Sequence, residues 1–164
     1  MSSDDVNIDV VSDMDVAWPE LESLYLAIAR YHEPMTGERL LPGWQEIQRA
    51  ALAVGGERFI AIARERGRAV GFIEGVIRRD PGLFGTDLGF VNTAYVDAER
   101  RRRGIGRRLL AVFEEWCRAH DVTRIDLSVR AANVAGIAAW RALGFEDESL
   151  RLTKHIASPD SDRA

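Results

Sequence analysis

The residues with the clearest chemistry form an arginine-rich turn with two glycines, between Arg100 and Arg108. The turn leads into an amphipathic helix whose apolar stripe is Ile105, Leu109, Val112, Phe113 and Trp116. Cations at a helix N-terminus oppose the macrodipole, at about 0.3–1 kcal/mol each when exposed. A bound anion would offset that cost, and Gly104 and Gly106 would let it approach the backbone N–H groups. The turn therefore predicts a phosphate or pyrophosphate site.

The overall charge favours a discrete anionic ligand over a polyanion. The 164-residue chain has a formal net charge of −4, which argues against a nucleic-acid partner or an anionic membrane surface. No hydrophobic run is long enough to span a bilayer, and the N-terminus lacks a signal-peptide pattern, so we expect a cytoplasmic protein. The three histidines are scattered and Cys117 is the single cysteine, so no metal site is expected.

Hydrophobic periodicity predicts the elements that must hold this turn. Strands are expected at residues 6–11, 58–64, 69–78, 88–96 and 124–129, with a terminal hairpin of residues 145–147 and 150–156. A first helix is expected from Ser12 or Asp13 to near Tyr31, because Pro34 disfavours helix just before it. Further helices are expected at residues 42–54, after the arginine-rich turn, and at residues 133–143, closed by Gly144.

This order of elements predicts an α+β fold. We expect a mixed, mostly antiparallel sheet of about seven strands with helices packed on both faces. Residues 1–164 are expected to form a single domain with polar ends and an ordered core of about residues 6–156.

Two separate motifs make the chain resemble the GNAT N-acetyltransferase superfamily. Val96 followed by Arg101, Gly104 and Gly106 resembles the acetyl-CoA pyrophosphate loop of that superfamily. Asn133, followed eleven residues later by Gly144-Phe145, resembles its second signature. The resemblance extends over the predicted element order and implies a GNAT-like fold with acetyl-CoA as cofactor. It further implies transfer of an acetyl group to a primary amine of a small molecule or a peptide.

The resemblance implies a role for each matching residue. Backbone N–H groups of residues 102–107 would hold the pyrophosphate, and the strand end at residues 94–96 would pair with the pantetheine amides. Asn133 would hydrogen-bond the pantetheine arm or order the loop beside it, and one arginine would meet the 3′-phosphate. The implied cofactor-binding set is Ala94, Tyr95, Val96, Arg101, Arg102, Arg103, Gly104, Ile105, Gly106, Arg107, Asn133 and Trp140.

The sequence departs from the family pattern where proton transfer is expected. Trp140 stands where many members carry a tyrosine that protonates the departing thiolate, and indole cannot do so. Asn92 stands where many members carry a glutamate base, and an amide cannot replace it. Two milder departures are Ala98 in place of proline and Arg102 in place of glycine.

Other groups are candidates for the catalytic roles. Glu74 and Asp87 are candidate general bases acting through water, and each is equally compatible with a solvated surface charge. A backbone N–H near Val96 would polarise the acetyl carbonyl. A thiol pKa near 8.5 lets the thiolate leave without strict need of an acid.

The acceptor amine is expected across the sheet from the cofactor. Tyr31, His32 and Glu33 are candidate contacts in the loop of residues 31–41, which would face the terminal hairpin. The alternative is that His32 and Glu33 are only a helix-end cation and a surface acid. The exposed terminal strand could also pair with a second copy, which would give a homodimer.

Two other functions compete with amine acetylation. A non-catalytic acyl-CoA-binding regulatory module would also explain Asn92 and Trp140, and thiol release with any amine would eliminate it. A nucleic-acid binder using the arginine-rich turn is disfavoured by the acidic balance and the absence of a groove-reading motif.

Overall fold

A computed structural model describes residues 6–52, 57–80, 85–154 and 156, and its centre is one mixed β-sheet. The described strands lie in the order β1-β2-β3-β4-β5. Four are antiparallel neighbours: β1 (Val6–Val10), β2 (Arg58–Glu65), β3 (Arg68–Arg78) and β4 (Leu88–Val96). The short β5 (Ile125–Leu127) runs parallel to β4. The predicted α+β architecture and mostly antiparallel sheet are confirmed.

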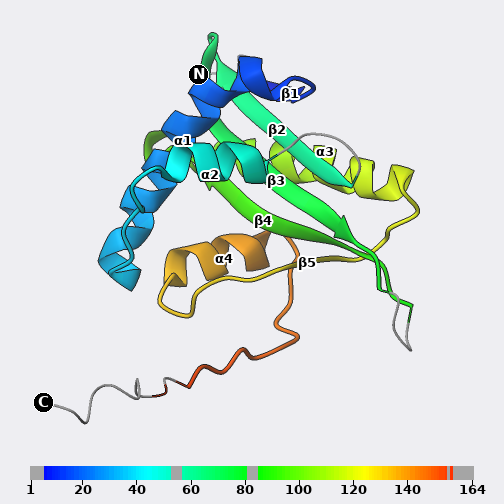
Figure 1. Ribbon diagram of the computed structural model, residues 1–164. Helices are drawn as coiled ribbons and strands as arrows, with labels where there is room; N and C mark the ends of the chain where they lie inside the picture. The colour runs from blue at the N-terminus through cyan, green and yellow to red at the C-terminus, as the bar shows by residue number, and fades with distance from the viewer. Residues whose placement is uncertain (1–5, 53–56, 81–84, 155, 157–164) are drawn as a thin grey trace, which may run out of the picture.

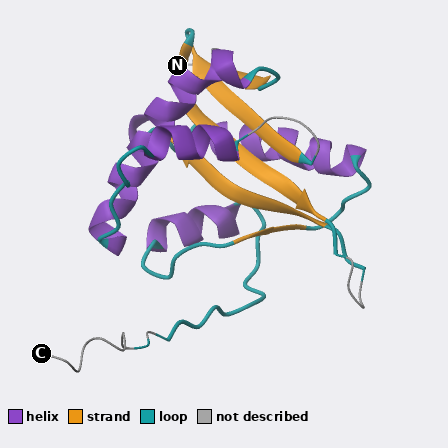
Figure 2. Ribbon diagram, in the orientation of Figure 1, coloured by secondary structure: helices purple, strands orange, loops and turns teal. Residues whose placement is uncertain are grey.

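Helices cover both faces of the sheet, as Figures 1 and 2 show. On one face lie α1 (Met14–Thr36) and α2 (Trp44–Ala51), and on the other lies α3 (Ile105–Ala119). The remaining helix, α4 (Val134–Ala142), follows β5 and lies beside β4 and β5 (Figure 1). None of the helices in the described ranges is long and apolar enough to cross a membrane.

Two apolar clusters, one on each face, fix the helices to the sheet. Between the sheet and α3, the largest buried side chains include Ile73, Ile105, Leu109 and Phe113. Between the sheet and α1, the cluster includes Trp18, Leu21, Leu24, Ile60 and Phe72. Alternation along the middle of β3 therefore places Phe72 and Glu74 on the α1 face and Ile73 on the α3 face.

The first helix is longer than the sequence predicts. It begins after the cap Asp13, whose carboxylate accepts the N–H groups of Asp15 and Val16 at 2.9 and 3.3 Å. It continues through Pro34 and ends at Gly37, which has φ 67° and donates its N–H to the Glu33 carbonyl at 2.8 Å. The expected end near Tyr31 is wrong because the helix tolerates the proline and ends at the left-handed glycine instead.

The sheet has five strands among the described residues, so the prediction of about seven is wrong. The missing pair is the terminal hairpin: the described residues after α4 contain no strand. Leu150, Leu152 and Ile156 alternate as a strand would, but their side chains are 83%, 83% and 87% exposed. An alternating sequence forms a strand only where a neighbouring strand can pair with it, and the edge strand β5 is only three residues long. The homodimer that pairing of this segment with a second copy could give stays a prediction.

A β-bulge interrupts the β3–β4 pairing next to the point where the β4–β5 ladder ends. Glu74 pairs with Thr93 whereas Gly75 pairs with Val91, so Asn92 is the extra residue. The β4–β5 ladder contains only residues 89–91 of β4, which leaves the last five residues of β4 without a ladder partner on that side. Gly75 lets the Phe113 ring of α3 pack directly on β3 beside the bulge, because a Cβ at position 75 would lie 2.6 Å from that ring. The bulge therefore opens the sheet edge at the predicted pantetheine strand.

Cys117 is a core residue of α3. It is 1% exposed, and burial raises the pKa of its thiol to about 11. We expect no reaction with DTNB at about pH 8 in the native chain and complete reaction in guanidinium chloride, because the reactive thiolate is disfavoured. Rapid labelling of the native chain would contradict this packing. A negative result would also show that the thiol adds no background when DTNB detects released CoA.

Candidate active site

The open edge of β4 presents unpaired backbone groups. Asp97 donates its N–H to the Val70 carbonyl at 2.9 Å, so Asp97 and Tyr95 direct their backbone groups toward β3. Because these directions alternate along a strand, Ala94 and Val96 direct theirs toward the opening. Arg101 Nε donates to the Val96 carbonyl at 3.0 Å. Among the described residues, the Val96 N–H and both backbone groups of Ala94 therefore have no strand partner on this side and face a ligand that would lie along this edge.

The arginine-rich turn has the conformation of an anion-binding loop. Gly104 is the N-cap of α3 with φ 78° and provides no side-chain cap, so the first N–H groups of the helix face the turn. A Cβ on Gly104 or Gly106 would meet no heavy atom within 4 Å, which shows open space beside both. Arg102 has φ 62°, a left-handed conformation that favours glycine and explains why glycine is common at this family position.

The arginines of the turn divide into anchored and exposed side chains. Arg100 donates to Glu65 at 2.5 Å, and Arg103 lies 3.6 Å from the same carboxylate. Arg101 bonds to the Val96 carbonyl and lies over the rings of Tyr31 and Tyr95, 4.8 and 5.8 Å from their centroids. Arg102 and Arg107 are exposed to solvent at the start of α3. The loop thus fits a pyrophosphate, with backbone donors inside and guanidinium groups around them.

Asn133 and Trp140 lie on the helix beside the opening. Asn133 is the N-cap of α4, and its Oδ1 accepts the Gly136 N–H at 3.0 Å and the Tyr31 hydroxyl at 3.1 Å. Trp140 packs edge-on against Phe145, with ring centroids 5.3 Å apart. Its ring supports the apolar cluster under α3. The indole therefore has a packing role in this structure.

Glu74 is buried on the α1 face, directly at the bulge. It is 2% exposed and is the one charged residue in the buried core of the described chain. Asn92 Nδ2 donates to Glu74 Oε1 at 2.9 Å, and Arg58 pairs with the same oxygen. These two donors leave Oε2 for another partner. The carboxylate that the sequence lacks at position 92 is thus held one hydrogen bond away, on the neighbouring strand.

Tyr25 adds an unusual polar group to this cluster. It is 8% exposed and its ring packs at a tilt against Phe72, with ring centroids 4.8 Å apart, yet its buried hydroxyl has no hydrogen-bond partner among the described residues. Burial, followed by the charge of Glu74, raises the pKa of Tyr25. The side chains of Gln48 and Thr93 lie near the hydroxyl and oppose this shift, but neither meets the geometry of a hydrogen bond to it. Tyr25 is therefore a neutral hydroxyl at every physiological pH.

Replacing Tyr25 by phenylalanine is expected to increase the free energy of unfolding by about 1 kcal/mol, because it removes an unpaired buried hydroxyl. Urea denaturation followed by circular dichroism measures this change. Leu24 on the same helix offers a contrast, since Leu24→Ala should destabilise the chain by about 2–5 kcal/mol. A destabilised Tyr25→Phe variant would show that the hydroxyl has a partner in solution.

Asp87 lies apart from this cluster. It precedes β4 at the end opposite the turn and pairs with Arg79, with Asp87 Oδ2 2.6 Å from Arg79 Nη1. That hydrogen bond, together with the N–H of Asp80, lowers the pKa of Asp87. Asp87 lies at the end of β4 away from the open edge, whereas Glu74 lies at the bulge where the ladder to β5 ends, so the geometry favours Glu74 as the base.

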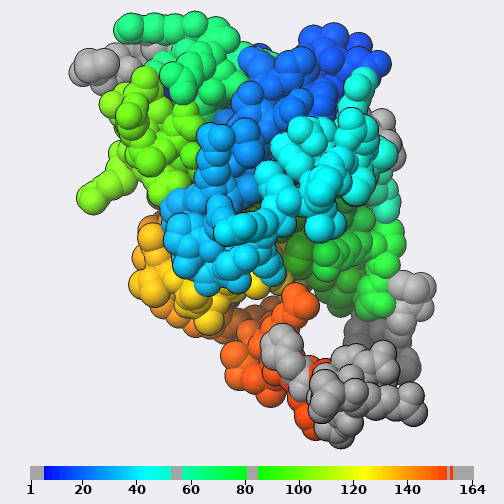
Figure 3. Space-filling view, turned by 60° about the vertical axis from the view of Figure 1, so that its left-hand side comes forward, coloured from blue at the N-terminus to red at the C-terminus, as the bar shows by residue number. Residues whose placement is uncertain are grey.

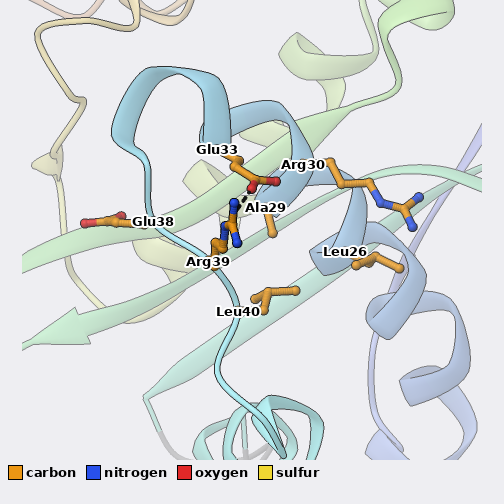
Figure 4. A pocket seen from close by; sticks show the side chains of 7 residues that line it. All are labelled: Leu26, Ala29, Arg30, Glu33, Glu38, Arg39 and Leu40. Carbon is orange, nitrogen blue, oxygen red and sulfur yellow. Dashed lines mark ion pairs between the residues drawn. The ribbon is translucent and has the colours of Figure 1, made fainter.

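The three acceptor candidates on α1 do not converge on one point. Tyr31 faces Asn133, and His32 packs against Tyr31 at 5.4 Å between ring centroids. Burial, and then Arg130, lowers the pKa of His32. Glu33 instead lies on a pocket of about 330 Å³ and pairs with Arg39 at 3.2 Å (Figure 4). The pocket lies on the outer side of α1 and is lined by Leu26, Ala29, Arg30, Glu33, Glu38, Arg39 and Leu40.

Sequence reasoning missed Arg58, Tyr25 and Gly136 as members of this region. Arg58 and Tyr25 reach Glu74 from β2 and α1, so their proximity depends on strand register and helix docking. Gly136 could have been noticed, because a glycine inside a short helix disfavours that helix unless packing requires it.

Comparisons with known proteins identify the family. The family model described as the Acetyltransferase (GNAT) family matches residues 18–145. An aminoglycoside N(6')-acetyltransferase type 1 of Stenotrophomonas maltophilia is 32% identical over 105 residues, which are 63% of this chain and 68% of that protein. A ribosomal protein bS18 alanine N-acetyltransferase of Salmonella typhimurium is 39% identical over 56 residues, 34% of this chain and 38% of that protein.

Solved structures share the fold at lower identity. The aminoglycoside N-acetyltransferase AAC(6')-Iy in complex with CoA matches with a TM-score of 0.74 and 17% identity, covering 96% of this chain and 100% of that one. A mutant of the BH1408 protein from Bacillus halodurans matches with a TM-score of 0.79 and 19% identity, covering 92% and 99%. The predicted resemblance is confirmed: the chain belongs to the GNAT acetyltransferase family and is an acetyl-CoA-dependent N-acetyltransferase.

Proposed function

We propose that this enzyme acetylates a primary amine of a small molecule or a peptide at the open edge of β4, with Glu74 as the general base. The observation that carries the proposal is the buried carboxylate of Glu74 at the bulge, where the ladder to β5 ends. As part of the proposal, residues 1–164 act as one acetyl-CoA-binding domain in the cytoplasm.

Acetyl-CoA would lie across the segments that the sequence indicated. Backbone N–H groups of residues 102–107 would hold the pyrophosphate, helped by the guanidinium groups of Arg102 and Arg107. The free backbone groups of Ala94 and Val96 would pair with the pantetheine amides. The Val96 N–H would then donate toward the acetyl carbonyl as the reaction makes its oxygen more negative.

The amine must lose its proton before it can attack the carbonyl. Glu74 Oε2 would accept that proton, directly or through one water, while Arg58 and Asn92 keep Oε1 in place. The neutral amine then forms the C–N bond, and the C–S bond breaks with its electron pair on sulfur. The nitrogen gives up its second proton, to the thiolate or to solvent, which leaves the amide and free CoA. A thiol pKa near 8.5 makes the thiolate a good leaving group, so Trp140 need not supply a proton.

The names of the relatives suggest which classes of acceptor amine to test. One relative is named for an aminoglycoside and another for the alanine of a ribosomal protein, so both kinds of primary amine belong in the test. Because Glu74 lies on the α1 face, we place the acceptor on that face and the pantetheine arm along the open edge of β4, between β4 and α4.

An amine panel tests the proposal. Wild-type enzyme is incubated with acetyl-CoA and aminoglycosides, diamines or peptides with N-terminal alanine, and CoA release is measured together with the mass of the product. We expect amine-dependent thiol release and a product heavier by one acetyl group. Release without acetylated product, or no release with any amine, would contradict the proposal.

A further inference from the structure

Tyr31 connects the two segments that hold acetyl-CoA in the proposed function. Its hydroxyl donates to Asn133 Oδ1 at 3.1 Å, and its ring lies under the guanidinium of Arg101 at 4.8 Å. Figure 3 shows the C-terminal part of α1 against the yellow segment that leads into α4, and an ion pair between Glu38 and Arg130 joins the same surfaces at 2.6 Å. The contact exists because α1 continues past Tyr31 to Thr36.

The hydrogen bonds of Asn133 determine the positions of the oxygen and the nitrogen of its side-chain amide. The backbone N–H of Gly136 is only a donor, so the atom that it meets at 3.0 Å must be the amide oxygen. Tyr31 provides a second donor to that oxygen, which occupies both of its lone pairs. The amide nitrogen therefore directs its two N–H donors away from Tyr31 and from the N–H of Gly136.

Gly136 stabilises the same orientation by leaving space for it. A Cβ at position 136 would lie 2.4 Å from Asn133 Nδ2 and 2.7 Å from Cγ. Any other residue would therefore push the amide out of its present place. The Tyr31 hydroxyl on α1 and the missing Cβ of Gly136 on α4 thus hold the Asn133 side chain in a single conformer.

We propose that Tyr31 and Gly136 are positioning residues for acetyl-CoA, because they hold the Asn133 amide with its N–H donors toward the pantetheine arm. This inference rests on the proposed function, in which the pantetheine arm lies between β4 and α4. It moves Tyr31 from the acceptor side, where the sequence suggested it, to the cofactor side.

The test compares two ligands. Acetyl-CoA contains the pantetheine arm, whereas adenosine 3′,5′-bisphosphate contains only groups that would bind at the arginine-rich turn. Tyr31→Phe keeps the ring under Arg101 and removes only the hydroxyl. By isothermal titration we expect acetyl-CoA to bind about three- to tenfold more weakly, as for loss of one hydrogen bond. Adenosine 3′,5′-bisphosphate should bind as it does to the wild type.

Matched variants complete the design. Gly136→Ala is expected to give the same selective loss, because it displaces the amide while alanine supports the helix. Ser23→Ala removes an exposed hydroxyl of α1 that donates to the Pro19 carbonyl at 3.2 Å, and it should change neither affinity. At saturating acetyl-CoA, kcat of Tyr31→Phe should stay near that of the wild type, since the loss is one of binding.

Three results would overturn the inference. Equal weakening of both ligands in Tyr31→Phe would show that the hydroxyl only supports the fold, and unchanged acetyl-CoA affinity would show that it does not position Asn133. Gly136→Ala with unchanged acetyl-CoA affinity would show that the Asn133 conformer is irrelevant to binding. A wild type that binds adenosine 3′,5′-bisphosphate and not acetyl-CoA would instead refute the proposed pantetheine path, and this inference with it.

Discussion

Replacing Glu74 by glutamine is expected to lower kcat/KM for the amine by about 10²- to 10³-fold, the range typical for loss of a general base. Glutamine has the same shape and still offers an oxygen to Arg58 and Asn92, so the site should remain assembled. The amide cannot take the proton of the ammonium group. Steady-state kinetics over a range of pH measure the effect, and the affinity for acetyl-CoA should not change.

The second carboxylate candidate serves as the comparison. Asp87→Asn removes an acid that pairs with Arg79 at the far end of β4, and we expect its kcat/KM to stay within about threefold of the wild type. Circular dichroism melting of both variants checks the fold, since Glu74→Gln leaves the half-buried Arg58 without its carboxylate partner. A loss of less than about threefold in Glu74→Gln would assign the base to another group.

Replacing Gly106 by glutamate is expected to weaken acetyl-CoA binding by at least about 100-fold while the fold is retained or stabilised. A Cβ at this position meets no heavy atom within 4 Å, so the side chain fits the free enzyme. A carboxylate in the first turn of α3 also interacts favourably with the helix macrodipole, by about 0.3–1 kcal/mol. The glutamate side chain would occupy the space proposed for the pyrophosphate, and its negative charge would repel the phosphate groups.

The Gly106→Glu experiment is specific because the affinity for acetyl-CoA should fall while the free energy of unfolding stays the same or rises. Isothermal titration gives the affinity, and urea denaturation gives the free energy of unfolding. Ala111→Glu adds the same charge on the exposed side of α3, beyond its first turn, and should leave acetyl-CoA affinity unchanged. Retained affinity in Gly106→Glu would place the pyrophosphate elsewhere.

Local features were predictable from the sequence. The turn and α3 follow from glycine placement and helical periodicity, both of which depend on neighbouring residues only. The hairpin of β2 and β3 and the strand β4 were predicted within a few residues of their observed bounds for the same reason. The segment that we propose for acetyl-CoA could therefore be predicted from one sequence, because most of the donors that we assign to it are backbone groups.

Features that depend on partners distant in the chain were not predictable. The alternation of Leu150 and Leu152 satisfies the strand pattern, but no described strand lies against it. Pro34 indicated an early end of α1, whereas the left-handed Gly37 ends it. The surroundings of Glu74 combine residues from β2, β4 and α1, which only the register of the sheet and the docking of α1 bring together.

A crystal structure of the enzyme with bound acetyl-CoA tests the central claim most directly. We expect hydrogen bonds between the pantetheine amides and the backbone of Ala94 and Val96, and the pyrophosphate on the N–H groups of residues 102–107. Glu74 Oε2 should lie close enough to an amine at the acetyl carbon for direct transfer or one bridging water, within about 6 Å. A pantetheine arm that leaves β4 unpaired, or a thioester on the far side of the sheet from Glu74, would contradict it.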